Sequence, residues 1–308
     1  MAMYYSLEKH CSNFHLYIFA FNNLSYRILT EANLKHATII SLTDFENEAL
    51  LEVKPTRSVA EYCWTCTPST IHYVLSNYEV DNCTYLDADL LFYSSPQVLF
   101  DELTADKNVI ITEHRYAKST ELYEQNRGGR FCVQFVTFTN KPNSLAVLET
   151  WKNQCLEWCY ARYEDGKFGD QKYLDVWPEK YGNVHILEHL GGGLAPWNAN
   201  NYAYEKGDKL FVKEKAGQNR FPLVFYHFHY VHIMQNLQTD IGWHIIPSII
   251  KKHIYAPYIK QLLAIETELK RNYPEFIPLR YGNKAKGLKD NLKKYFKLIT
   301  QYNILNIQ

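Results

Sequence analysis

Short apolar runs alternate with helical segments through the first half of the chain, and this order restricts the fold more than any other feature of the sequence. Strands that alternate with helices are typical of an open α/β sheet, so we predict that class. The strands that the pattern predicts are 14–21, 37–42, 84–87, 109–112, 131–138 and 223–229. The helices that it predicts are one from the turn at Asn22 through Leu34, one that Thr67 caps and Pro68 begins, and one from Pro142 to about Tyr163.

The composition indicates a folded protein with reduced thiols. The chain has 308 residues, of which 46% are hydrophobic, enough for a well-filled core, and this excludes disorder as the main state. Its seven cysteines are odd in number and form no extracellular framework, while Glu8 and Lys9 interrupt the region where a signal peptide would be apolar. The longest apolar runs have about half the length of a spanning helix. We therefore expect a cytoplasmic protein with no membrane span.

Charge divides the sequence into two parts. The whole chain has 33 basic and 33 acidic side chains, which gives no electrostatic argument for nucleic-acid binding. From Lys251 onward, the sequence has 12 basic and 4 acidic residues, a net charge of +8, and the preceding part carries a net charge of −8. We predict a catalytic domain at 1–250 and a basic helical extension at 251–308. An amphipathic helix within 284–308 would lie peripherally on anionic lipid, or else present a solvated lysine face while it closes the core.

The strongest chemical signal is an Asp-Ala-Asp sequence at the end of a predicted strand. Side chains alternate along an extended chain, so Asp87 and Asp89 should point the same way, with the small Ala88 between them. Two such carboxylates call for a cation, and a divalent ion would join them to a diphosphate. The alternative is an ordinary surface turn, but apolar residues on both sides favour a site at the carboxyl end of a strand.

Several ordered blocks over residues 14–232 resemble the metal-dependent nucleotide-diphosphosugar glycosyltransferases of the GT-A fold. The likeness is strongest to glycogenin-like and bacterial lipooligosaccharide galactosyltransferase-like enzymes, and its blocks are 85–92, 168–175 and 194–198. The resemblance implies a GT-A α/β fold, a nucleotide-diphosphate sugar as donor and a glycan or lipid-linked acceptor. It also favours retention of anomeric configuration and a role in bacterial surface polysaccharide or lipopolysaccharide assembly.

Two histidines on the last predicted strand are candidates for a further metal ligand. His227 and His229 flank Phe228, so both should face the side opposite Phe228. The resemblance places a third protein ligand on this strand, and we predict Asp87, Asp89 and His227 as the metal set. An imidazole beside two carboxylates favours Mn²⁺ over Ca²⁺, with Mg²⁺ as the alternative metal. Taken alone, either histidine is more typical of a satisfied core residue.

Three residues are predicted to take part in catalysis. Asp170 and Gln171 follow Gly169, where they could accept a proton from an acceptor hydroxyl or steady an oxocarbenium-like centre; a helix N-cap is the alternative for Asp170. Related enzymes often carry Asn-x-Gly where this chain has Cys132-Val133-Gln134. Gln134 could therefore hydrogen-bond a sugar hydroxyl or the reacting face.

The remaining predicted site residues would hold the donor. By resemblance, the regions around Phe21, Tyr26, Arg57, Trp64 and Thr67 hold the base and ribose, although core packing explains the aromatic residues nearly as well. Arg115 could offset phosphate or sugar charge, with a surface ion pair as the alternative. The other members of the predicted donor-binding set are Asp87, Ala88, Asp89, Trp197 and Asn198.

Other readings of the sequence are weaker. Cys63 and Cys66 have the spacing of a zinc or redox half-site but lack a second pair. Gly191–Gly193 has neither P-loop nor dinucleotide-binding spacing. A phosphatase with an Asp-x-Asp motif would carry Thr or Val where this chain has Leu91. A non-catalytic sugar-nucleotide or carbohydrate-binding protein of the same fold is the main alternative to an enzyme.

Overall fold

A four-stranded mixed sheet forms the centre of the molecule in the computed structural model, which describes residues 1–118, 120–215, 217–281, 296–297 and 299–306. The strand order is β3-β6-β5-β7, with β6 antiparallel to both β3 and β5, and β7 parallel to β5. The strands of this sheet are β3 (Asn82–Leu86), β5 (Val109–Glu113), β6 (Phe131–Thr139) and β7 (Val184–Ile186).

Smaller sheets surround the central one. A parallel pair is formed by β1 (Leu16–Ala20) and β2 (Ala37–Ser41), and an antiparallel pair by β4 (Leu90–Phe92) and β11 (Phe225–His227). Two three-stranded sheets consist of β8 (Tyr202–Lys206), β9 (Leu210–Glu214) and β10 (Arg220–Pro222), and of β12 (His232–Ile233), β13 (Thr239–Asp240) and β14 (Ile304–Leu305).

Helices cover both faces of the central sheet. The α-helices are α1 (Ala2–His10), α2 (Asn23–Glu31), α3 (Leu42–Phe45), α4 (Glu48–Val53), α5 (Val59–Asn77), α6 (Gln97–Phe100), α7 (Glu121–Gly128), α8 (Pro142–Glu157), α9 (Trp177–Lys180), α10 (Ser248–Ile250) and α11 (Ala256–Asn272). The shorter helical segments are η1 (Lys54–Thr56), η2 (Lys172–Val176), η3 (Ala199–Asn201) and the π-type turn η4 (Lys251–Tyr255). Within the described part of the chain, no helix combines the length and the apolar character needed to cross a bilayer.

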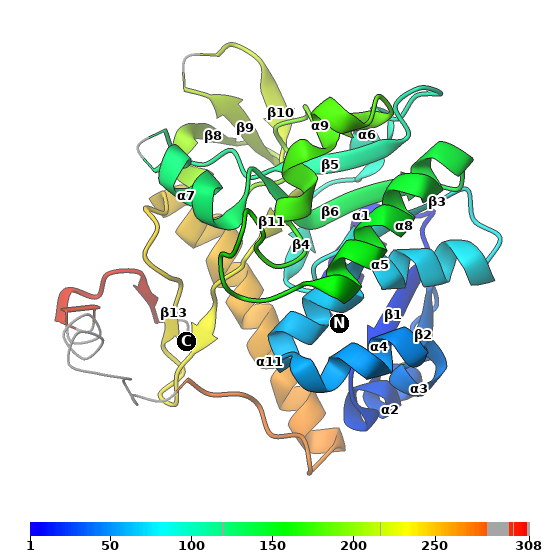
Figure 1. Ribbon diagram of the computed structural model, residues 1–308. Coiled ribbons are helices and arrows are strands. Elements are labelled where there is room, and N and C mark those ends of the chain that lie inside the picture. The colour runs from blue at the N-terminus through cyan, green and yellow to red at the C-terminus, as the bar shows by residue number, and fades with distance from the viewer. Residues whose placement is uncertain (119, 216, 282–295, 298, 307–308) are drawn as a thin grey trace.

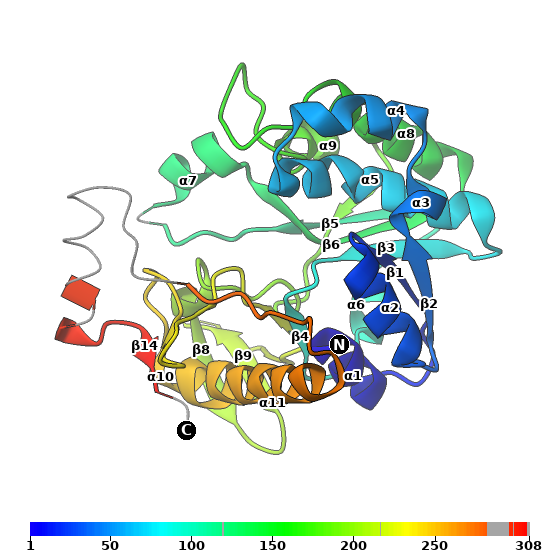
Figure 2. The ribbon, with the colours of Figure 1, turned by 90° about the horizontal axis from the view of Figure 1, so that it is seen from below.

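The core has one apolar layer on each side of the sheet. Figure 2 shows α5 and α8 on one side, and α1 and α11 on the other. Trp151 of α8 and Ile71 of α5 pack with Phe138 of β6 in the first layer. In the second layer, Phe135 of β6 stacks on Phe225 of β11, with ring centroids 5.5 Å apart. The sheet is thus buried on both faces, and its strand ends remain available for a site.

A third apolar cluster ties the C-terminal helix to the region around β4 and β11. Phe228 stacks on Tyr258 of α11, with ring centroids 3.6 Å apart, and Leu91 and Ile250 belong to the same cluster. The cluster therefore contains residues from both sides of the predicted boundary at residue 250. Most of the predicted basic helix, namely residues 284–295, 298, 307 and 308, lies outside the described residues.

The predicted α/β class is confirmed, but several predicted element boundaries are wrong. The helix expected to begin at Pro68 begins at Val59, because Ser58 and Glu61 form a capping box there, and Pro68 lies inside it. The helix expected to reach about Tyr163 ends at Glu157. Between the strands predicted at 109–112 and 131–138, the structure has α7, a helix that was not predicted.

Candidate active site

Asp87 and Asp89 lie in a tight turn between β3 and β4. The Leu90 amide donates to the Asp87 carbonyl (3.3 Å), and the Asp87 amide donates to the Gln134 carbonyl on β6 (3.2 Å). The Phe228 amide donates to the Asp89 carbonyl (3.1 Å). The expectation that an extended strand aligns the two aspartates is therefore wrong. The turn instead brings each of the two carboxylates next to the ring of His227.

Both carboxylates meet the ring of His227. The Nε2 atom of His227 lies 3.1 Å from Asp89 Oδ1 and 3.6 Å from Asp87 Oδ2. On the other side of the ring, Nδ1 donates to Gln134 Oε1 (2.8 Å). This bond fixes the ring orientation and leaves Nε2 facing the acids, as a second-shell partner does for a metal-binding histidine.

The charges of His227 and Asp89 stabilise each other, whereas the two acids repel each other. Burial alone would lower the pKa of His227, but the charge and hydrogen bond of Asp89, together with Asp87, raise it well above its ordinary value. For Asp89, burial acts to raise the pKa, and His227 more than offsets it, so the pKa is lowered. For Asp87, burial dominates and raises the pKa, with a further contribution from the Asp89 charge. The two acids thus favour the charged form of the His227 ring.

These residues fit a divalent cation. One oxygen of each carboxylate lies within 3.6 Å of His227 Nε2, and the place is partly open to solvent on the side of Asp89, whose side chain is 42% exposed. A cation placed there would replace the proton on Nε2. An oxygen-rich set with one imidazole suits Mn²⁺ or Mg²⁺ and leaves room for ligand oxygens.

Cys132 on β6 is a member of the cluster that the sequence did not single out as a site residue. One ligand atom each from Asp87, Cys132 and His227 lie within 4.8 Å of one another. Burial raises the pKa of the Cys132 thiol, so the uncomplexed thiol is neutral. The only signal in the sequence was its place in the Cys132-Val133-Gln134 block.

Asp170 is buried near the paired acids. Its backbone carbonyl accepts a bond from the indole N–H of Trp151 (2.8 Å), and Gly169 before it has a φ of +53° and packs against the Trp64 ring. Its side chain is not an N-cap, because the following η2 segment is preceded by Gln171 and has no side-chain cap. Burial raises the pKa of Asp170 to about 7, the charge of Asp87 acts in the same direction, and a hydrogen bond with Thr67 opposes it.

The two predicted catalytic amides are placed differently. Gln134 is fully buried, and while its Oε1 atom accepts from His227, its Nε2 atom has no partner. Gln171 uses its Nε2 atom to donate to the carbonyl of Gly128, at the end of α7. Gln134 therefore faces the acidic cluster, whereas Gln171 anchors the end of a neighbouring helix through its bond to Gly128.

Trp197 and Asn198 build the wall beside His227. The Asn198 amide nitrogen donates to the carbonyls of His114 (2.8 Å) and Gly193 (2.9 Å), and its oxygen accepts from the Ala195 amide (3.0 Å). The Trp197 indole also donates to the His114 carbonyl (2.9 Å), and its ring centroid lies 5.3 Å from that of His227. The contacts of Asn198 are thus structural, and its predicted donor-binding role stays a prediction.

Arg115 approaches the same wall from the loop after β5. One of its terminal nitrogens donates to the Gly192 carbonyl, and the other, Nη1, is buried without a partner. A Cβ on Gly193 would lie 2.7 Å from Thr112 and 2.9 Å from Arg115, and 3.4 Å from the free Nε2 of Gln134. A side chain at Gly193, whose φ is +78°, would therefore be strained and would collide with Thr112 and Arg115.

The predicted base and ribose residues do not form one group. Arg57 lies over the ring of Tyr160 (4.0 Å) and donates to the Leu156 carbonyl (3.2 Å), so it fastens the end of α8. Trp64 packs beside Gly169, and Tyr26 is 37% exposed on α2.

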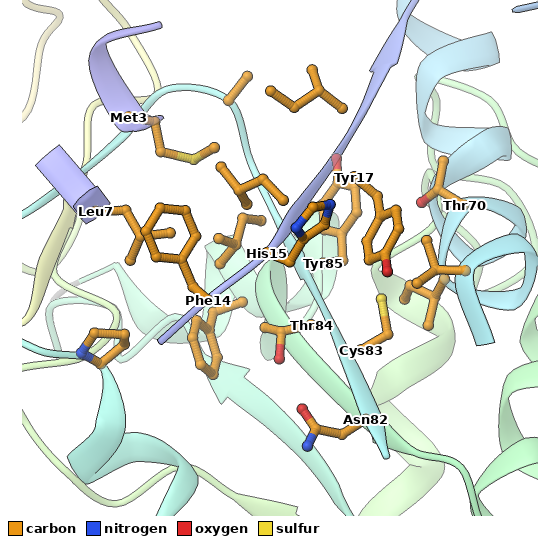
Figure 3. Close-up of a pocket in the computed structure, with 18 of the residues that line it drawn as sticks. Met3, Leu7, Phe14, His15, Tyr17, Thr70, Asn82, Cys83, Thr84 and Tyr85 are labelled. Carbon is orange, nitrogen blue, oxygen red and sulfur yellow. The ribbon is translucent and has the colours of Figure 1, made fainter. Parts of the chain in front are cut away.

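Phe21, Thr67 and Ala88 line a cavity of about 680 Å³ between β1, β3 and α5. Figure 3 shows Tyr17 from β1, His15 from the residue just before this strand, and Tyr85, Thr84 and Cys83 from β3 at this cavity. Tyr85 connects it to the acids, because its hydroxyl donates to Asp87 Oδ1 (3.1 Å). No other residue of the predicted donor-binding set lines this cavity.

Together, the fold and the site define a mixed α/β protein with a carboxylate and imidazole cluster beside its central sheet. No family model matches the chain. Two uncharacterized proteins of Bacillus subtilis (strain 168) are similar to it: YfnD, 30% identical over 90% of this chain and 88% of its own length, and YfnF, 32% identical over 74% and 76%. The chain belongs to the family of YfnD and YfnF.

Solved structures of the galactosyltransferase LgtC are also similar to this chain. A complex with donor and acceptor sugar analogs has a TM-score of 0.47 and 15% identity, over 74% of this chain and 81% of LgtC. An active-site mutant has a TM-score of 0.44 and 13% identity, with the same coverage.

Proposed function

We propose that this protein is a GT-A-type glycosyltransferase that moves a sugar from a nucleotide-diphosphate donor to an acceptor hydroxyl. The observation that carries the proposal is the meeting of Asp87 and Asp89 at one ring nitrogen of His227 (3.6 and 3.1 Å), beside the buried carboxyl of Asp170. A surface turn would not bury a histidine against two acids. A cation site next to a buried acid suits the departure of a diphosphate.

A divalent cation, with Mn²⁺ preferred, would be held by Asp87, Asp89 and His227. When bound, the cation would neutralise the negative charge on the leaving diphosphate. The Gln134 side chain would hold His227 in the tautomer whose Nε2 atom faces the cation.

Unpartnered polar atoms around the cluster support a polar ligand. In the described part of the chain, eight buried side-chain atoms lack a hydrogen-bond partner, and four of them belong to residues around this site. They are His114 Nδ1, Arg115 Nη1, Gln134 Nε2 and Asp170 Oδ2. Buried polar atoms without partners are costly, so such a concentration favours a ligand that supplies hydroxyls or phosphate oxygens. Arg115 and Gln134, which both lie near Gly193, would contact the sugar or a phosphate.

Asp170 would act on the reacting groups. With a pKa of about 7, a substantial fraction of its carboxyl is ionised at neutral pH, where it can accept a proton or steady positive charge at the sugar carbon. We expect activity to rise with pH through about 7. Gln171 would assist from the neighbouring position.

The cavity bounded by Phe21, Thr67 and Ala88 would receive the nucleoside end of the donor. Its volume of about 680 Å³ falls in the range of small-molecule sites, and Ala88 places its rim next to the metal cluster.

The wider biological role that we propose is the one that the motif resemblance implies. It comprises retention of anomeric configuration, a lipid-linked or glycan acceptor in surface polysaccharide or lipopolysaccharide assembly, and work in the cytoplasm at the inner membrane face. The division into a 1–250 catalytic domain and a basic extension belongs to the same proposal.

Release of nucleoside diphosphate from a panel of nucleotide sugars tests the function. We expect metal-dependent release with Mn²⁺ that a chelator stops, and loss of that release in Asp87→Asn and Asp89→Asn but not in Asp208→Asn, an exposed control. Binding of nucleotide sugars without release from any donor, with or without added sugar acceptors, would instead indicate a binding protein. Hydrolysis of simple phosphate monoesters would indicate a phosphatase.

A further inference from the structure

Cys132 places a thiol inside the cluster that the proposed function assigns to an oxygen-preferring cation. Its Sγ atom, an oxygen of Asp87 and a nitrogen of His227 lie within 4.8 Å of one another, and the cysteine is 4% exposed. The described part of the chain contains no other such group of cysteine, histidine and acidic ligands.

The backbone accounts for this placement. Between the pairs Ile110↔Thr137 and Thr112↔Cys132, β5 advances by two residues while β6 advances by five, so a bulge separates Cys132 from the regular part of the strand. Bulges redirect side chains near functional sites. Cys132 packs against Trp197 and Ala195, and this packing keeps the thiol beside His227.

A second observation points to a ligand at the same place. Gln134, on the same strand, is fully buried and holds His227 Nδ1 through its Oε1 atom, yet its Nε2 atom has no partner. On the His227 ring, Nδ1 is therefore occupied by Gln134. The other ring nitrogen, His227 Nε2, lies on the side of the acids and is the atom left for a ligand.

We propose that Cys132 makes this site bind thiophilic divalent cations such as Zn²⁺ and Cd²⁺ through Asp87, Cys132 and His227, in competition with Mn²⁺. The inference rests on the proposed function for the existence of the metal site, and it adds a ligand and a metal class. Thiolate, imidazole and carboxylate are common zinc ligands, whereas oxygen-preferring ions gain little from sulfur. On binding, the Cys132 S–H bond and the Nε2–H bond of a charged His227 ring would break, both protons would go to solvent, and metal–sulfur and metal–nitrogen bonds would replace metal–water bonds.

Cadmium absorption tests this site without any measurement of activity. The full chain, freed of metal by a chelator, is titrated with Cd²⁺ while the ultraviolet charge-transfer absorption of the cadmium–thiolate bond is recorded. We expect this absorption in the wild type, its loss in Cys132→Ser, and its retention in Cys66→Ser, a control at an equally buried thiol. Asp87→Asn should weaken Cd²⁺ binding by about 10- to 100-fold although the thiol remains.

Competition with Mn²⁺ separates the two proposals. We expect Cys132→Ser to bind Mn²⁺ with unchanged affinity and to lose the preference for Cd²⁺ over Mn²⁺, with a wild-type circular dichroism spectrum as the check on folding. If Mn²⁺ binds in an Asp87-dependent way but Cys132→Ser keeps the absorption and the Cd²⁺ preference, the role of Cys132 is refuted and the proposed function stands. If neither ion binds the wild type, both proposals fail.

Discussion

Replacement of Asp170 by Asn should make the stability of this protein less sensitive to pH. The carboxyl is 3% exposed, and burial raises its pKa from 3.8 to about 7. As the pH rises from about 4 to 7, the unfolded chain gives up this proton while the folded chain still holds it. The folded state therefore loses stability across that window, and above about 7 the loss is complete.

The size of the effect follows from the two pKa values. Each pH unit between them is worth about 1.4 kcal/mol, so the wild type should lose about 4 kcal/mol through this one group. The Asn side chain does not ionise, so the variant loses no stability through this position as the pH rises. The free energy of unfolding of Asp170→Asn, relative to the wild type, should thus increase by about 4 kcal/mol between pH 4 and 7.5 and then stay level.

Urea unfolding followed by tryptophan fluorescence, in the presence of a chelator, measures this difference at each pH. Asp208→Asn removes an exposed carboxylate, and its difference from the wild type should stay within about 0.5 kcal/mol at every pH. A difference for Asp170→Asn that is also flat from pH 4 to 7 would show that the carboxyl is ionised throughout, and the reasoning about its burial would be wrong.

Three further substitutions test the framework of the site. Gln134→Ala removes the partner of His227 Nδ1 and should weaken Mn²⁺ binding by about 10- to 100-fold in calorimetry; an unchanged affinity would exclude a positioning role. Gly193→Ala sets a Cβ 2.9 Å from Arg115 at a φ of +78°, so it should lower the free energy of unfolding by more than about 1 kcal/mol, and equal or higher stability would contradict the tight contact. Ser58→Ala removes half of the capping box of α5 and should cost about 1 kcal/mol in urea unfolding without a change in ligand binding, whereas no loss would place the helix start elsewhere.

The start of α5 shows where local sequence signals compete. Thr67 and Pro68 have the chemistry of a helix N-terminus, yet the helix begins at Val59, since Ser58 and Glu61 satisfy its free amides reciprocally. Proline inside a helix removes one backbone hydrogen bond, a cost that burial of the surrounding residues offsets here. Short sequence motifs do not show how deeply these residues are buried, so they could not predict that the helix continues through Pro68.

The sequence by itself determined the α/β class and pointed to the paired acids as the candidate site. Hydrophobic runs and helical segments follow the chain in order, so their alternation is visible without any tertiary contact. The same holds for Asp87 and Asp89, which are two residues apart at the end of an apolar run, and for His227 and His229 on either side of Phe228.

Only the tertiary structure decided which groups meet. It selected His227 for the acids because β11 pairs with β4, and it added Cys132 through the bulge in β6. It also buried Asp170, the main source of its raised pKa, and the charge of Asp87 acts in the same direction. These relations depend on distances and desolvation between segments far apart in the chain, and such quantities exist only once the sheet and its neighbouring strands have packed.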